Sequence, residues 1–431
     1  MPQRSPLAIH WGLDPATTFL NHGSFGATPH AVLAVQRALR DRLESQPVRF
    51  MVRDLEPLLD AARTALAGLI GADADDLAFL PNATTGVNTA LAACSLQAGD
   101  ELLTTDHEYN ACRNALEATA RRTGATVVVA RVPFPLSAAA EVTEALLARV
   151  TPRTRLVLID HVTSPTGLVL PLAEIIAALR ARGIDTLVDG AHTVGMVPLD
   201  LASLGATYYT GNLHKWLCAP KGAAFLWVRR DLQSTVRPLV ISHGANSPRA
   251  DRSRFRLEFD WTGTADPTPY LAVPAAIAFM QCVLPGGLEA VMAHNRGLAL
   301  AARKILCESL GVAPPAPDDM IGSLAAVTLP DGDVAPPRSP FYLDALQEAL
   351  YARGIEVHAW FNPFRALTNN SQQVAANHVS RSAPNTTKRF GTMTWCDPAS
   401  ADTRARALNV ILDVVRRYDI DGVHLDDYFY P

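Results

Sequence analysis

Two charged residues lie where they could perform covalent chemistry on an aldehyde cofactor. Asp189 ends the apolar segment DTLVD, and Lys215 follows 26 positions later within TGNLHKWL. A lysine amine forms an imine with the aldehyde of pyridoxal phosphate, and a buried carboxylate keeps the pyridine nitrogen protonated so that the ring accepts electrons. A simple ion pair in a sheet explains the same two residues. The pair therefore indicates this chemistry only together with other parts of such a site.

The segment PNATTGVN, residues 81–88, predicts an anion site. It follows an apolar run and opens a helical pattern, with Thr84, Thr85 and Gly86 at the turn. Free backbone N–H groups and the positive end of a helix dipole attract a phosphate at such a turn. An ordinary helix cap made by Thr or Asn is the simpler alternative.

Aromatic and imidazole side chains occur beside these segments. DHEYNA places Tyr109 just after another apolar run, where its ring could lie flat on a cofactor ring. A tyrosine that caps the core fits equally well. His192 follows Asp189 by three positions and His214 directly precedes Lys215. Both are either structural histidines or parts of the site, and their adjacency to the charged pair favours the site.

Short apolar segments that alternate with amphipathic helical patterns must position these residues. The expected strands are 77–80, 101–106, 126–132, 155–162, 185–190, 206–211, 223–228 and, later in the chain, 323–329. This alternation is typical of an α/β fold with a mostly parallel sheet flanked by helices. Ligands of such sheets collect where strands end, so we expect the chemistry just after each strand.

The composition excludes several classes of function. The 431 residues are 48% hydrophobic and carry a net charge of −4, which predicts neither a nucleic-acid partner nor a membrane surface. The sequence contains no apolar run of 18 residues, so no membrane span is predicted. The N-terminus lacks the apolar stretch of a secretory signal. The six cysteines form no CxxC pairs, so we expect neither a metal site nor disulfides. A cytoplasmic globular protein is the resulting expectation.

Seven motifs in one order carry a family resemblance. NHGSFGATP, PNATTGVN, DHEYNA, HVTSPTG, VDGAH, TGNLHKW and WTGTAD together resemble the class V aminotransferase family of fold-type I pyridoxal-phosphate enzymes. The resemblance covers roughly residues 8–357 and is greatest to the isopenicillin N epimerase-like subgroup. It implies pyridoxal 5′-phosphate as cofactor, an amino acid as the small-molecule substrate, and a homodimer.

The resemblance also implies a role for individual residues. Lys215 would carry the cofactor as an aldimine and move the proton at the substrate α-carbon. Asp189 would pair with the pyridine nitrogen, His192 would lie near the phenolic oxygen, and Tyr109 would stack on the ring. The remaining implied contacts are Thr84, Thr85, Asn212 and His214 to the phosphate, Thr264 to the phosphate across the dimer interface, Ser164 to the phenolic side, and Asn21, His22, Gly23 and Ser24 beside the substrate.

The motifs leave the outcome of the reaction open. Return of the α-proton to the opposite face gives epimerisation, transfer to C4′ gives transamination, and loss of a substituent gives a lyase. A desulfurase would need a catalytic cysteine on a mobile loop. Cys396 occupies a polar stretch whose context, MTWCDP, does not match that family, and Cys218 in WLCAP is expected to be a buried inert thiol.

The C-terminal part departs from the family pattern. We expect a substrate-loop segment at 1–30, a large cofactor-binding domain at 31–285 and an incomplete small domain at 286–357. Residues 358–431, an atypical α/β tail, resemble a fragment of a glycosyl-hydrolase-like TIM-barrel family. The usual small-domain arginine for the substrate carboxylate has no counterpart, and Arg365 and Arg389 are the candidate substitutes.

Two alternatives to an active pyridoxal-phosphate enzyme follow from the tail. Asp426 and Asp427 suit the paired-carboxylate chemistry of a carbohydrate hydrolase, although a fragment of about 74 residues is far shorter than a barrel of roughly 250. The other alternative is a hybrid that binds the cofactor without turnover because its substrate anchor is gone.

Overall fold

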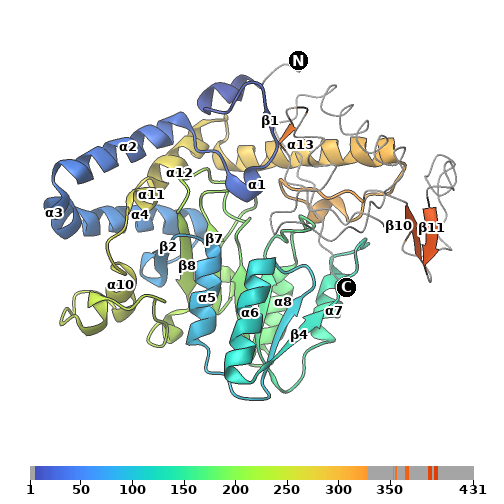
Figure 1. Ribbon diagram of the computed structural model, residues 1–431, viewed down its shortest axis with the longest axis horizontal. Helices are drawn as coiled ribbons and strands as arrows, with labels where there is room; N and C mark the ends of the chain where they lie inside the picture. The colour runs from blue at the N-terminus through green and yellow to red at the C-terminus, as the bar shows by residue number, and fades with distance from the viewer. Residues whose placement is uncertain are drawn as a thin grey trace.

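The computed structural model describes residues 5–328, 353, 355–356, 365–367, 387–390 and 393–396. Its centre is a seven-stranded sheet in the order β2-β8-β7-β6-β5-β3-β4 (Figure 1). The strands are β2 (Leu77–Leu80), β3 (Glu101–Thr105), β4 (Thr126–Ala130), β5 (Thr154–Asp160), β6 (Asp185–Asp189), β7 (Tyr208–Asn212) and β8 (Ala224–Val228). All neighbours are parallel except the two pairs that contain β8. The expected α/β fold with a mostly parallel sheet is confirmed.

Helices cover both faces of this sheet because its strands carry apolar residues on both sides. Along β5, Val157 and Ile159 belong to one core cluster, while Leu156 and Leu158 belong to another. The helices of the first cluster include α4 (Leu55–Ile70), α7 (Ala140–Leu147) and α8 (Leu172–Arg180), and those of the second are α5 (Ala83–Ala93), α6 (Asn110–Thr123) and α10 (Arg254–Phe259). The central strands are therefore rigid supports for whatever lies at their ends.

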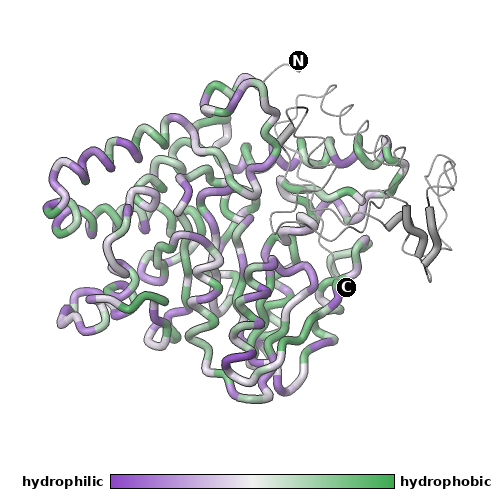
Figure 2. The backbone as a smooth tube through the Cα atoms, viewed as in Figure 1, coloured by the Kyte–Doolittle hydropathy of each residue, from purple (hydrophilic) through white to green (hydrophobic). Residues whose placement is uncertain are grey.

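A further helical layer adjoins the sheet. Its longest members are α2 (His30–Ser45) and α13 (Gly287–Leu310), and α12 (Val273–Cys282) contacts both of them as well as α4 (Figure 1). Hydrophilic and hydrophobic stretches alternate along α2 in Figure 2, as in a helix with one exposed face. The shorter elements are α1 (His22–Phe25), α3 (Pro47–Arg49), α9 (Leu201–Leu204), α11 (Thr268–Leu271) and the single turns Pro6–His10, Phe50–Asp54, Ala74–Asp76, Arg230–Leu232, His243–Asn246 and Asp318–Met320.

Two small sheets involve later parts of the chain. β1 (Thr18–Phe19) pairs in parallel with β9 (Ile355–Glu356). β12 (Met393–Cys396) lies between β10 (Arg365–Leu367) and β11 (Thr387–Phe390) and is antiparallel to both. The expected domain boundaries stay predictions. The side chains of Arg365, Arg389 and Cys396 lie outside the described part of the chain, as do Asp426 and Asp427.

The strand expected at 323–329 is wrong for its described residues. Residues 323–327 are buried and Thr328 is half-buried, but they join no ladder among the described residues, and main-chain pairing at this place is limited to a single bridge between Ile321 and Leu168. Leu324 packs instead in a small apolar cluster with Val162 and Met196. Side-chain packing, rather than a ladder, thus holds this segment in place. The other seven expected strands are confirmed, with boundaries within two residues.

The described residues contain no single helix that is long and apolar enough to cross a membrane. A helix pair bent by 70°, Thr268–Cys282 with Gly287–Leu310, reaches that length and composition only when taken together. Within the same part of the chain, the thiols of Cys94, Cys112, Cys218, Cys282 and Cys307 are free.

Candidate active site

The ends of β5 and β6 place two aspartates side by side. Asp160 and Asp189 end these strands and are register partners in the parallel pair, and each is only 2% exposed. Asp189 accepts hydrogen bonds from the Ala191 N–H at Oδ1 (2.9 Å) and from the Cys112 thiol at Oδ2 (3.1 Å). The expected position of Asp189 at the end of a buried strand is confirmed, and its side chain is held from two directions.

Lys215 approaches the same edge from the loop after β7. Its Nζ lies 2.9 Å from Nε2 of His192, whose side chain is buried in the turn that follows β6. The charge of Lys215 is close enough to lower the pKa of Asp189, while burial raises that pKa more strongly. The structure therefore brings together three of the residues that the sequence singles out, namely Asp189, His192 and Lys215.

The N-terminus of α5 forms the candidate phosphate cup. Asn82 caps the helix, because its Oδ1 accepts hydrogen bonds from the N–H (2.8 Å) and the hydroxyl (3.0 Å) of Thr85. Asn212, at the end of β7, accepts a hydrogen bond from the Ala83 N–H at 2.9 Å. A Cβ at Gly86 would overlap the Thr210 side chain on β7, so glycine is what allows this close packing.

The geometry of PNATTGVN is compatible with both predictions made for it, an ordinary helix cap and an anion site. The turn is an ordinary Asn-capped helix start, and it also places Thr84, Thr85 and Asn212 at one helix N-terminus. His214 lies in the adjoining loop, where its Nδ1–H donates to the Ala223 carbonyl (3.1 Å). Burial and the nearby Lys215 lower the pKa of His214 to about 4, so its ring is neutral at pH 7. A contact of these groups with phosphate stays a prediction.

The N-terminal loop lies directly on Lys215. Asn21 caps α1 by accepting the Ser24 N–H at 3.2 Å. A Cβ on Gly23 would stand 3.4 Å from the His192 ring, and one on Gly26 would overlap the Lys215 carbonyl oxygen. Burial, followed by the charge of Lys221, lowers the pKa of His22 to about 4. The predicted substrate loop thus borders the site, and its contact with a substrate stays a prediction.

Three other predicted site residues lie in the connections between strands and helices. Tyr109 directly precedes α6 and packs beside the core cluster that contains Cys112. Ser164 is buried in the turn after β5. Thr264 is exposed between α10 and α11, so its expected contact with the site of a second copy remains a prediction. The ring-stacking role of Tyr109 and the phenolic contact of Ser164 also stay predictions.

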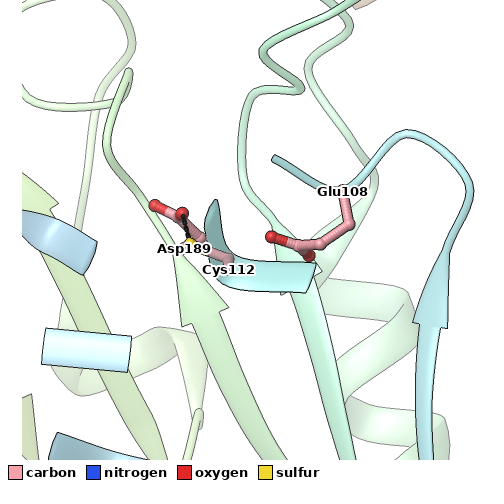
Figure 3. A group of neighbouring side chains, drawn as sticks. All are labelled: Glu108, Cys112 and Asp189. Atoms are coloured by element: carbon pink, nitrogen blue, oxygen red, sulfur yellow. Dashed lines mark hydrogen bonds between the residues drawn. The ribbon is translucent and has the colours of Figure 1, made fainter. Parts of the chain in front are cut away.

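The structure places a group of buried acids around Asp189 that the sequence analysis does not predict. The ligand atoms of Glu108, Cys112 and Asp189 all lie within 4.8 Å of one another (Figure 3). Burial and the neighbouring carboxylates raise the pKa of both Glu108 and Asp160 well above the usual range. We name Glu108, Cys112, Asp160 and Asp189 the acid cluster. Its signal was present, because RLVLID and DTLVD both end in aspartate and DHEYNA contains the glutamate.

The acid cluster is suited to holding protons. Burial and the nearby Asp189 also raise the pKa of the Cys112 thiol well above its usual value, whereas a metal ligand must be a thiolate. Oε1 of Glu108 and Oδ2 of Asp160 are buried without hydrogen-bond partners among the described residues. An ionised carboxylate in such a position is costly, so burial favours the protonated form of Glu108 and of Asp160.

Replacing Glu108 with glutamine is expected to flatten the pH dependence of stability. The folded-state pKa of Glu108 lies above its unfolded value, so between the two values the folded protein binds one proton more than the unfolded chain. The free energy of unfolding of the wild type therefore falls as pH rises from about 4.3 towards the raised pKa, by up to about 1.4 kcal/mol per pH unit. Glutamine does not titrate. Denaturant unfolding across this range should therefore show the variant gaining stability relative to the wild type as pH increases. If the free energy of unfolding of the two proteins depends on pH in the same way, Glu108 is not the group that retains the proton.

Comparison with known proteins identifies relatives of several activities. A profile of the family described as aminotransferase class-V matches residues 26–359, and one described as glycosyl hydrolase-like 10 matches 341–431. The second match begins before the expected boundary at 358 and overlaps the first. Isopenicillin N epimerase from Amycolatopsis lactamdurans is 41% identical over 336 residues, which cover 74% of this chain and 83% of the relative.

The chain is also similar to a relative of a different activity and to a solved structure. L-cysteine desulfhydrase from Arabidopsis thaliana is 31% identical over 329 residues, covering 72% of this chain and 70% of the relative. A solved structure of a C-DES mutant, with glycine covalently linked to its PLP cofactor, has a TM-score of 0.68 at 23% identity and covers 95% of this chain and 100% of that chain. The structural likeness shows the fold, and the family resemblance expected from the motifs is confirmed.

Proposed function

Because the chain belongs to the aminotransferase class-V family, we propose that it is a pyridoxal 5′-phosphate enzyme acting at the α-carbon of an amino acid. The observation that carries this proposal is the placement of Lys215 Nζ 2.9 Å from His192, beside the buried Asp189 and at the edge of the sheet where α5 begins. An amine, a carboxylate and a helix N-terminus thus face one place.

The residues fit this cofactor by their chemistry. When bound, pyridoxal phosphate supplies an aldehyde that captures amines and a ring that accepts electrons. In our proposal Lys215 holds it covalently, Asp189 holds the pyridine nitrogen, and Tyr109 covers the ring. The other proposed contacts are His192 and Ser164 on the phenolic side, Thr84, Thr85, Asn212 and His214 at the phosphate, and Thr264 of a second copy in a homodimer.

In this proposal Asp189 and Lys215 have separate roles. Asp189, kept close by the Ala191 N–H and the Cys112 thiol, stabilises positive charge on the ring nitrogen. Nζ of Lys215 accepts the substrate α-proton, and the protonated amine can exchange with solvent before it returns a proton to carbon. The burial of Asp189 and His192 keeps water from this edge, which strengthens both interactions.

We propose epimerisation as the first candidate outcome, with transamination and elimination as alternatives. The 41% identity to isopenicillin N epimerase supports that order. Burial raises the pKa of Cys218 to about 12, so this thiol is neutral at pH 7 and is not a sulfur-accepting thiolate. This argues against a desulfurase that uses Cys218 and leaves the three outcomes at the α-carbon to the exchange experiment. A cytoplasmic location completes the proposal.

An α-deuterium exchange screen over the amino acids tests the function. Protein loaded with pyridoxal phosphate is expected to incorporate solvent deuterium into at least one amino acid, because Lys215 exchanges the abstracted proton with solvent. Chiral analysis of the product detects epimerisation, a keto acid of unchanged carbon skeleton detects transamination, and loss of a side-chain substituent detects elimination. Bound cofactor with no exchange in any amino acid would instead support the hybrid without turnover.

A further inference from the structure

Trp216 contacts the ring that faces Lys215. Its indole N–H donates to Nδ1 of His192 at 3.3 Å, while Nε2 of the same imidazole lies 2.9 Å from Lys215 Nζ. The three side chains form a short line from the indole through the imidazole to the amine. Neither the motifs nor the family resemblance assigns a part to Trp216 in the site.

An indole N–H can donate a hydrogen bond but cannot accept one. Nδ1 of His192 must therefore offer a lone pair, and the single proton of the neutral ring must be on Nε2. We infer that Trp216 is a positioning residue that fixes His192 as the Nε2–H tautomer, so that the imidazole presents a hydrogen-bond donor to the amine of Lys215. Protonation of Nδ1 would place its N–H opposite the indole N–H of Trp216, and neither of these donors can accept a hydrogen bond. The same contact therefore disfavours the charged, doubly protonated ring.

The indole is itself held from several sides. It packs in the apolar cluster of Val162, Met196 and Leu324. A Cβ on Gly23 would stand 3.3 Å from its Cζ2 atom, which shows how closely the N-terminal loop covers the ring. Because the ring is already packed, the hydrogen bond to His192 requires little further ordering of the side chain.

The tautomer matters for the state of Lys215. A donor at Nε2 needs a lone pair on Nζ, and only the uncharged amine has one; the uncharged amine is also the form that attacks an aldehyde. Asp160 and Asp189 face the same nitrogen and favour the ammonium form when ionised, and His214 stands beside it. The Trp216–His192 pair thus opposes the two carboxyl groups at Nζ.

The tautomer can be measured without any cofactor. In cofactor-free protein carrying 15N-labelled histidine, the two nitrogen shifts of His192, assigned by their loss in His192→Gln, are expected to show a protonated Nε2 and an unprotonated Nδ1. Trp216→Phe keeps an apolar ring and removes the donor, so its His192 should become a mixture of tautomers. A wild-type ring protonated at Nδ1 would overturn the inference without the need for a variant, and so would an unchanged Nε2–H signature in a folded Trp216→Phe protein.

A matched control and a second readout separate this inference from the proposed function. Trp11→Phe removes an indole N–H that donates to the Ala27 carbonyl, and it should leave the His192 signature unchanged. The second readout rests on the proposed function: the rate of covalent pyridoxal-phosphate capture should fall about tenfold in Trp216→Phe, the factor expected for one lost hydrogen bond. Absence of capture by the wild type, with the tautomer as expected, would overturn the proposed function and uphold the role of Trp216 in fixing the ring.

Discussion

Lys215→Ala is expected to abolish the borohydride-sensitive absorption band that the wild-type protein develops with pyridoxal phosphate. The variant lacks the amine whose Nζ lies 2.9 Å from His192, so it can neither attach the cofactor nor accept the α-proton. Loss of a group that serves as both nucleophile and base lowers rates by on the order of 10³-fold or more, and α-deuterium exchange should fall by at least that factor.

The control for this experiment is an exposed lysine. Lys304 lies on the surface of α13, so Lys304→Ala should keep both the band and the exchange rate. Absorbance before and after borohydride, followed by mass analysis of the labelled peptide, identifies the attached residue. A Lys215→Ala protein that retains the band would show that another amine carries the cofactor.

Asp189→Asn is expected to separate cofactor capture from catalysis. Asparagine preserves the shape of the side chain and can still accept the Ala191 N–H, but it has no charge to stabilise a protonated ring nitrogen. Lys215 is unchanged, so the absorption band should form. Exchange of the α-proton should fall by on the order of 10³-fold, the scale found when one electrostatic contact to a reacting group is lost.

Asp160→Asn is the matched comparison. Asp160 is the register partner of Asp189 on β5 and is equally buried, yet burial and the carboxylates of Glu108 and Asp189 raise its pKa well above the usual range and so favour its uncharged form. Asparagine resembles that uncharged form, so the substitution should lower exchange far less than Asp189→Asn. Equal losses in the two variants would mean that general disturbance of the acid cluster, and not charge at position 189, explains the effect.

Much of this arrangement could be predicted from the sequence because parallel strands end at a common edge. Apolar runs located seven strands, and Asp189, which ends β6, lies near enough to Lys215 in the loop after β7 for the two charges to interact, as that rule requires. The glycine-containing turn at 81–88 likewise predicted a helix N-terminus, since Asn82 is a strong cap. These features depend on local patterns that extend over only a few residues.

Other features depend on strand order and loop conformation, which local patterns do not encode. Asp160 adjoins Asp189 only because β5 lies next to β6. The contact of Trp216 with His192 needs the turn around Gly195, whose φ is +90° and where a Cβ would collide with the Trp216 backbone. An apolar segment such as 323–327 can also be buried without pairing, so its composition alone wrongly predicts a strand.

The pairing of β1 with β9 has a consequence for biosynthesis. Thr18–Phe19 emerge from the ribosome early, but their partners Ile355–Glu356 are translated more than three hundred codons later. The segment that follows β1 is the one that lies on Lys215. A nascent chain can thus synthesise all seven strands of its central sheet before the partner of β1 follows, and the segment that lies on Lys215 gains this pairing only afterwards.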